Sequence, residues 1–318
     1  MHSFDFPWRV VSDLGISYEL IGDGGRCLRA PARGDVRERP IVGDYVRVDE
    51  ASSHVVAVAP RRSWIARANS NGERQFVAAN LTAAFVVTSP EPREFSPRRI
   101  ARYLVALHAG NVDPVVVLNK ADADRDASAH VAALREAADG APVLPVSARD
   151  GANCEALAAY LQRGATVALC GSSGVGKSTL LNRLAGQAHM ATAEMRADGR
   201  GRHTTTVRRL IYLPSGAAVV DTPGMRSFMP WAAAEHVGEA FGDIALLAAQ
   251  CRFADCEHAA EPGCAVRDGA SPDRLEQWRK LRREAEWLAS REDPAVAAER
   301  KSRWKQIHKA QRAELKRR

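Results

Sequence analysis

The sequence predicts a multidomain chain in which a small β-structured domain, an α/β domain and a helical domain follow one another. Short strand-forming runs separated by turns fill residues 1–77, a spacing typical of a small barrel or sandwich. Strands and helices then alternate over residues 78–230, which predicts a parallel sheet with helices on both faces. Residues 231–318 have a helical pattern interrupted by a cysteine-rich stretch.

Turns and strand formers alternate in the N-terminal segment. Gly43 and Asp44 form a turn before the strand formers Tyr45, Val46 and Val48. The run SHVVAVAP that follows is also rich in β-formers. The first residues lack the charged and apolar regions of a signal peptide, and no apolar run approaches the ~20 residues that span a bilayer. We therefore expect a cytoplasmic protein with no membrane segment.

The central segment has a regular alternation of elements. Each predicted strand has a run of apolar residues, and each predicted helix ends near a glycine or begins with a capping signal. Strands are expected at 82–89, 113–118, 141–147 and 166–171, helices at 96–110, 127–140, 153–164 and 177–186, and a two-stranded hairpin at 206–224.

A phosphate-binding loop follows the strand at 166–171. The stretch GSSGVGKS fits G-x-x-x-x-G-K-[ST], in which backbone N–H groups and the next helix N-terminus surround phosphates. Lys177 would reach the β- and γ-phosphates, and the Ser178 hydroxyl would bind Mg²⁺. The expected nucleotide-binding residues of this loop are Gly171, Ser172, Ser173, Gly174, Val175, Gly176, Lys177, Ser178 and Thr179.

A second motif, NKAD, selects the base. The Asp122 carboxylate can accept from N1–H and the exocyclic amine of guanine, whereas adenine presents the opposite pattern. Asn119 can bridge to the purine and brace the loop, and the Lys120 stem can cover the base. One helix and one strand later, Ser147 and the backbone of Ala148 could close the other side of the base. These residues predict a preference for GTP and GDP over adenine nucleotides.

The third motif, DTPG, follows the last strand. Asp221 can hold Mg²⁺ through water, and the Gly224 N–H can contact the γ-phosphate. In the preceding stretch GRGRHTTT, a threonine can bind Mg²⁺ while the γ-phosphate is present, so that the loop acts as a switch. Residues 204–206 are all threonines that compete for this role, and we favour Thr205. The expected Mg²⁺ ligands are Ser178, Thr205 and Asp221.

Along the chain, the two base-binding motifs come first, and the phosphate loop and the two switch motifs follow. The usual order begins with the phosphate loop. A circular permutation explains the order in this chain, because native chain ends that lie close together can be joined and the chain reopened elsewhere. The switch motif DTPG is then followed directly by the C-terminal region.

The C-terminal region contains CRFADCEHAAEPGC, which places Cys251, Cys256, His258 and Cys264 within one short polar stretch. Three thiolates and one imidazole form a closed tetrahedral set, typical of structural zinc. Cys27, Cys154 and Cys170 are scattered and have the character of small apolar residues.

Positive charge is concentrated at the end of the chain. The net charge is +7, and residues 273–318 contain 15 Lys/Arg against 8 Asp/Glu, so the rest of the chain balances. Either a solvated basic helix or a surface for phosphate-rich partners would explain this excess. Within it, one helical stripe is expected to dock on the cysteine-rich region, namely Leu275, Trp278, Leu281, Ala285 and Leu288.

The motif order, GRGRHTTT, DTPGMRSF and the cysteine cluster together resemble the circularly permuted small ribosomal subunit biogenesis GTPases, the RsgA family. This resemblance covers nearly the whole chain. It implies an N-terminal OB-fold barrel, a permuted α/β P-loop GTPase domain and a C-terminal zinc domain with one structural Zn²⁺. It also implies late maturation of the 30S subunit, contact of the basic tail with 16S rRNA, and GTP hydrolysis that the subunit stimulates.

The resemblance implies a catalytic role for His203, for which an ordinary exposed loop histidine is the alternative, and the motifs add Lys177 and Thr205 as catalytic residues. Met225 stands where many GTPases have a glutamine that orients the attacking water, so we expect slow intrinsic hydrolysis of GTP to GDP and phosphate. Two alternatives stay open, namely an RNA-binding module in which the nucleotide is mainly structural and a P-loop kinase or ATPase unrelated to RNA. No feature indicates an oligomer, so we expect a monomer.

Overall fold

The computed structural model describes residues 6–69, 71–186, 208–222, 230–232 and 234–292. Its strands are β1 (Trp8–Asp13), β2 (Tyr18–Gly22), β3 (Cys27–Ala30), β4 (Tyr45–Asp49), β5 (His54–Val58), β6 (Trp64–Ala68), β7 (Arg74–Ala79), β8 (Ala83–Thr88), β9 (Asp113–Leu118), β10 (Val143–Pro145), β11 (Thr166–Cys170), β12 (Arg209–Tyr212) and β13 (Ala218–Asp221). Its α-helices are α1 (Pro97–Ala109), α2 (Ala127–Ala137), α3 (Lys177–Ala185), α5 (Ala234–Glu239), α6 (Gly242–Ala248), α7 (Ala265–Gly269) and α8 (Pro272–Glu292), and its 3₁₀ helices are η1 (Asp23–Gly25), η2 (Ala121–Ala123) and η3 (Cys154–Tyr160).

The central sheet has the strand order β10-β9-β8-β11-β13-β12. Its first five strands are parallel, and β12 pairs antiparallel with β13 as the second strand of the expected hairpin. The strand before the phosphate loop, β11, lies beside β8, the first strand of this domain in the sequence. The sheet is therefore continuous in space although the chain enters it at an unusual strand, which is the arrangement that a circular permutation produces.

Helices cover both faces of this sheet, as the alternating pattern predicts. On one face, Ala84 and Val86 of β8 pack in a core cluster with residues of α1 and α2. On the other face, Phe85 and Val87 of the same strand pack with Leu180 of α3. Helix α1 begins as expected, since the Ser96 side chain accepts from the Arg99 N–H and Pro97 occupies the first turn.

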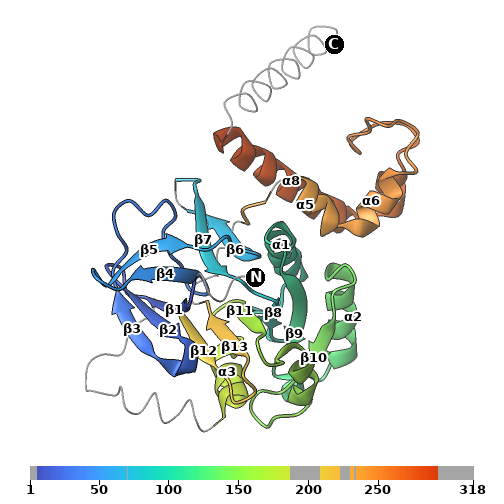
Figure 1. Cartoon of the computed structure of the whole chain (residues 1–318). Helices are drawn as coiled ribbons and strands as arrows, with labels where there is room; N and C mark the ends of the chain where they lie inside the picture. The colour runs from blue at the N-terminus through green and yellow to red at the C-terminus, as the bar shows by residue number, and fades with distance from the viewer. Residues whose placement is uncertain (1–5, 70, 187–207, 223–229, 233, 293–318) are drawn as a thin grey trace.

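The N-terminal strands form a curved sheet that lies beside the α/β domain (Figure 1). Strand β1 pairs with both β2 and β4, and β4 pairs with β5, which is a strand-rich architecture consistent with an OB-fold. One residue pair, Ser12 with Arg209, joins β1 to β12 and makes the two sheets continuous. The hairpin β6–β7 runs through Ala79, and the expected domain boundary after residue 77 stays a prediction.

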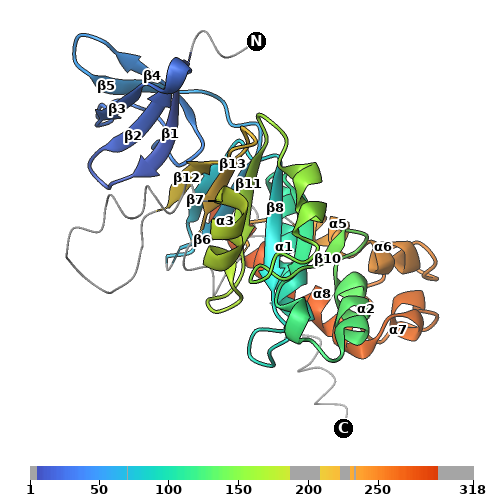
Figure 2. The ribbon, with the colours of Figure 1, turned by 90° about the horizontal axis from the view of Figure 1, so that it is seen from below.

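The C-terminal helices lie at the opposite end of the α/β domain from β1–β5 (Figure 2). The stripe expected on the last described helix is buried, since Leu275, Trp278, Leu281, Ala285 and Leu288 of α8 are at most 9% exposed. Part of this stripe packs in the same core cluster as α1, so α8 docks on the α/β domain as well as on the cysteine-rich region. No helix in the described part of the chain is long and apolar enough to span a membrane.

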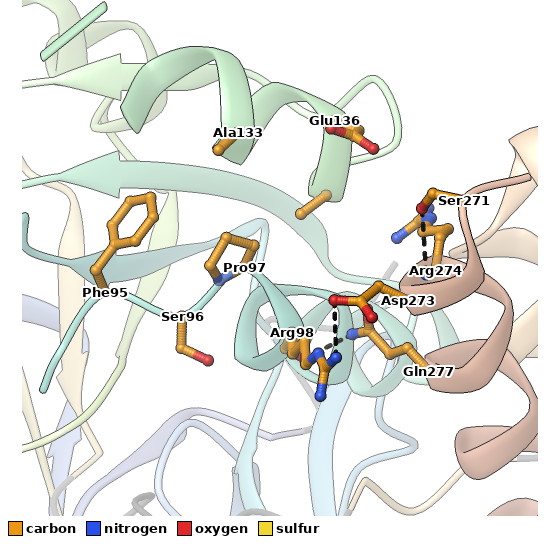
Figure 3. A pocket seen from close by; sticks show the side chains of 11 residues that line it. Phe95, Ser96, Pro97, Arg98, Ala133, Glu136, Ser271, Asp273, Arg274 and Gln277 are labelled. Atoms are coloured by element: carbon orange, nitrogen blue, oxygen red, sulfur yellow. Dashed lines mark hydrogen bonds and ion pairs between the residues drawn. The ribbon is translucent and has the colours of Figure 1, made fainter. Parts of the chain in front are cut away.

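Polar contacts line the junction between α1, α2 and α8, around a cavity of about 370 Å³ (Figure 3). Arg98 of α1 forms an ion pair with Asp273 at 2.9 Å, and the Gln277 side chain donates to the Arg98 carbonyl at 2.7 Å. One turn further along α1, Arg102 makes two bonds of 2.8 and 2.9 Å to Glu284. Helices α1 and α8 are thus joined by ion pairs and hydrogen bonds as well as by apolar packing.

One predicted helix differs from the structure. The segment expected to be helical at 153–164 contains a 3₁₀ helix, η3, which begins after Asn153 in a left-handed conformation. Tyr160 of this segment packs edge-on against Phe85 of β8, at 5.9 Å between ring centroids. Packing against the sheet therefore selects a tighter helix than the sequence pattern alone indicates.

Candidate nucleotide site and metal centre

The carboxyl ends of four strands of the parallel sheet bring the expected nucleotide-binding residues to one edge of the sheet. The phosphate loop follows β11, the NKAD motif follows β9, Ser147 and Ala148 follow β10, and Asp221 ends β13. This edge is where ligands bind in open α/β sheets. His203, Thr205 and Gly224 lie outside the described residues, so their expected roles stay predictions.

At two positions of the phosphate loop, a side chain would both strain the backbone and overlap a neighbouring segment. Gly171 and Gly176 have φ angles of +137° and +91°, which side chains rarely adopt. A Cβ atom at Gly171 would overlap the Val87 carbonyl, and one at Gly176 would overlap the Asn119 amide. The loop is therefore shaped by contacts with two other segments of the site, and not only by its own sequence.

Lys177 lies in the first turn of α3 with its ammonium over the loop. Its Nζ donates to the carbonyls of Gly171 at 2.9 Å and Ser172 at 2.7 Å. Burial lowers the pKa of Lys177 and raises the pKa of Asp221. The attraction between the two charges acts in the opposite direction on both pKa values. Anionic phosphates beside Lys177 and a divalent cation beside Asp221 would compensate these half-buried charges, so the residues present fit a nucleotide with Mg²⁺.

Asn119 connects the base motif to the rest of the site. Its side chain is buried, donates to the Val175 carbonyl at 2.8 Å and accepts from the Ala148 N–H at 2.9 Å. One buried amide thus joins the phosphate loop to the loop after β10. Lys120, in a left-handed conformation, forms an ion pair with Glu91 at 2.8 Å, and Asp122 is exposed.

The structure adds residues that the sequence did not reveal. Arg99 of α1 donates to the Ser172 hydroxyl in the phosphate loop at 2.7 Å. Arg183 of α3 donates to the Ala148 carbonyl at 3.2 Å. Neither arginine belongs to a local motif, so only the packing of α1 and α3 against these loops identifies them.

The cysteine-rich stretch brings its four expected ligands together between α6 and α7. The ligand atoms of Cys251, Cys256, His258 and Cys264 all lie within 4.8 Å of one another. His258 Nδ1 is 3.6 Å from Cys251 Sγ and 3.5 Å from Cys264 Sγ. Tetrahedral zinc with ordinary bond lengths would place sulfur and nitrogen about 3.6 Å apart, so the cluster fits one structural Zn²⁺.

The surroundings of the cluster act in opposite directions on two of its thiols and hold the imidazole. Backbone N–H groups of Val266 and Ala265 hold the pKa of the Cys251 thiol below its ordinary value. Desolvation instead raises the pKa of Cys256 to about 11, so this ligand would lose its proton on binding the metal. The His258 ring is buried and lies 5.4 Å from the Trp278 ring of α8.

The fold and the site define a P-loop GTPase whose α/β domain is circularly permuted. The chain belongs to the RsgA GTPase family, whose model matches residues 58–231. Family membership and the permuted fold, both expected from the sequence, are confirmed, and membership implies GTP hydrolysis.

Individual relatives match most of the chain. A protein of Opitutus terrae named "Small ribosomal subunit biogenesis GTPase RsgA" is 44% identical over 86% of this chain and 80% of its own length. A protein of the same name from Xylella fastidiosa strain 9a5c is 49% identical over 80% of this chain and 76% of its own length. The solved structure of YjeQ from Thermotoga maritima is similar with a TM-score of 0.64 and 27% identity, covering 87% of this chain and 97% of that one.

Proposed function

We propose that this protein hydrolyses GTP to GDP and phosphate, and that it acts in late maturation of the 30S ribosomal subunit. The relatives' names state small ribosomal subunit biogenesis, and the matches cover most of both chains. In this proposal the GTP-bound protein binds the subunit, the subunit stimulates hydrolysis, and the GDP-bound protein leaves.

The observation that carries the nucleotide site is the bridge made by Asn119. It joins the Val175 carbonyl of the phosphate loop to the Ala148 N–H beside the expected base pocket. A nucleotide would contact both loops, so this side chain holds the phosphate and base subsites at one spacing. Asp122 would then read guanine, and Ser147 and Ala148 would close the pocket.

The phosphate end uses groups from three segments. Lys177 would leave the two carbonyls that it contacts and pair with the β- and γ-phosphates. Ser178, Thr205 and Asp221 would hold Mg²⁺, which when bound neutralises charge on the phosphates. The Gly224 N–H would contact the γ-phosphate, and His203 would orient the attacking water.

The C-terminal region would hold one structural Zn²⁺ through Cys251, Cys256, His258 and Cys264. The basic residues of segment 299–318, which lies outside the described residues, would contact 16S rRNA, where phosphate contacts produce salt-sensitive affinity. We propose a monomer in the cytoplasm.

The test is GTP turnover with and without purified 30S subunits. We expect slow turnover alone, a large increase with the subunit, and tighter subunit binding with a non-hydrolysable GTP analogue than with GDP. Equal subunit affinity in both nucleotide states would instead favour an RNA-binding module with a structural nucleotide. Absence of GTP hydrolysis with subunits present would overturn the proposed activity.

A further inference from the structure

The loop that carries the base motif is anchored at both ends. Asn119 holds the first end, as described above. At the other end the carboxylate of Asp124, whose side chain is only 2% exposed, accepts from the Asp126 N–H at 3.0 Å and lies 2.9 Å from His130 Nδ1. Asp122 therefore lies between two fixed points, two residues before the second one.

His130 holds this second point from helix α2. The backbone N–H of His130 donates to the Asp126 carbonyl at 3.0 Å, and the His130 ring packs on Phe95 at 4.4 Å between ring centroids. Phe95 belongs to the segment between β8 and α1 that also provides Glu91, the ion-pair partner of Lys120. This single segment thus contacts the base-motif region at two places, once through Lys120 and once through the His130 ring (Figure 3 shows Phe95 at the edge of the α1–α2 cavity).

The contact between His130 and Asp124 also bears on which carboxylate is available to bind a nucleotide base. Asp122, Asp124 and Asp126 alternate along the chain, and all three could in principle accept hydrogen bonds. His130 draws Asp124 inward, while Asp122 is left exposed at the sheet edge. Without the His130 contact, the Asp124 carboxylate would be free to turn toward Asp122. Repulsion between the two negative charges would then widen the range of orientations that the Asp122 side chain samples.

We propose that His130 is a positioning residue for guanine recognition, acting through Asp124 to hold Asp122 in the plane of the base. This inference rests on the proposed function, because it assumes that Asp122 reads guanine. His130 itself does not touch the nucleotide in this scheme. It acts by hydrogen bonding and by packing on Phe95, and the orientation of the Asp122 carboxylate is what changes when it is lost.

The test compares GDP with IDP, which lacks the exocyclic amine of guanine. Calorimetric titrations would use the full-length chain as wild type, His130→Ala, His130→Asn and the control His108→Ala on α1. In the wild type, the ratio of GDP to IDP affinity reports the bond from the exocyclic amine to Asp122. We expect His130→Ala to weaken GDP binding about fivefold and to reduce the GDP:IDP ratio about threefold, the scale of one hydrogen bond.

His130→Asn should restore most of the ratio, because its amide N–H can reach Asp124 in place of Nδ1. A purely structural defect would lower GDP and IDP affinity equally and would leave the ratio at the wild-type value in His130→Ala, which would overturn the inference. A further titration of the wild type with ADP tests the proposed function separately. If that proposal fails, the wild-type protein binds ADP as tightly as GDP.

Discussion

The nucleotide edge and the cysteine cluster are both ligand sites, but the chain supports them in different ways. The phosphate loop of the nucleotide edge extends from β11, whose residues are all buried, and Asn119 braces this loop from the side. The cysteine cluster lies between helices of seven and five residues, α6 and α7, and most residues between its ligands are exposed. The buried strands fix the phosphate loop without a ligand, whereas a structural zinc would supply much of the local structure of the cluster.

The largest effect is therefore expected at the cluster. Cys264→Ser removes a buried ligand, and the loss of a structural zinc should cost several kcal/mol of local stability. We expect zinc content to fall from one ion per chain to none, and amides of the α6–α7 loop to lose hydrogen-exchange protection, while GDP affinity changes little. Metal analysis and hydrogen exchange measure both effects.

Cys27→Ser is the matched control, because Cys27 is exposed in the N-terminal sheet far from the cluster in sequence and fold. It should retain zinc and protection. Full zinc content in Cys264→Ser would contradict the difference drawn between the two regions.

At the nucleotide edge the largest effect is expected from Asn119→Ala. This change leaves the Val175 carbonyl and the Ala148 N–H without their side-chain partner. Each buried group left unsatisfied costs about 1–3 kcal/mol, and the two loops lose their fixed spacing. GDP affinity measured by calorimetry should fall at least tenfold, while zinc content stays at one ion per chain.

Gln162→Ala serves as the control at this site, because Gln162 is exposed in the same domain and its side chain bonds only to the nearby Ala158 carbonyl. Its GDP affinity should match that of the wild type. Unchanged GDP binding in Asn119→Ala would show that the bridge does not set the spacing of the subsites.

The same contrast explains how much the sequence could predict. The phosphate loop and the cysteine cluster are contiguous stretches, so their ligand sets follow from local spacing and are brought together as expected. The bond from Arg99 to Ser172 spans 73 residues, and the pair of Arg102 with Glu284 spans 182. Such contacts depend on which helix faces meet after folding, and no local pattern encodes them.

Helices and strands could be predicted where the residues that determine them all lie within one short segment. Helix α1 has a capping serine, a proline in its first turn and a glycine after its end, and the structure has a helix between them. The segment after Asn153 has helical composition, yet its packing against β8 selects a 3₁₀ helix. Likewise, nothing in either strand alone predicts that β1 pairs with β12 and joins the two sheets.

The smallest expected effect lies at the junction of the two regions. Arg102 of α1 and Glu284 of α8 are 24% and 20% exposed and make two bonds, in a geometry that strengthens an ion pair. In a double-mutant cycle of Arg102→Ala and Glu284→Ala, hydrogen exchange of α8 should report a coupling energy of about 1 kcal/mol. Arg282 and Glu286, an ion pair within α8 at 3.2 Å, provide the control with an expected coupling of about 0.3–0.5 kcal/mol. A coupling no larger than this control would mean that apolar packing alone holds α8 against the α/β domain, and that the two regions are energetically separate.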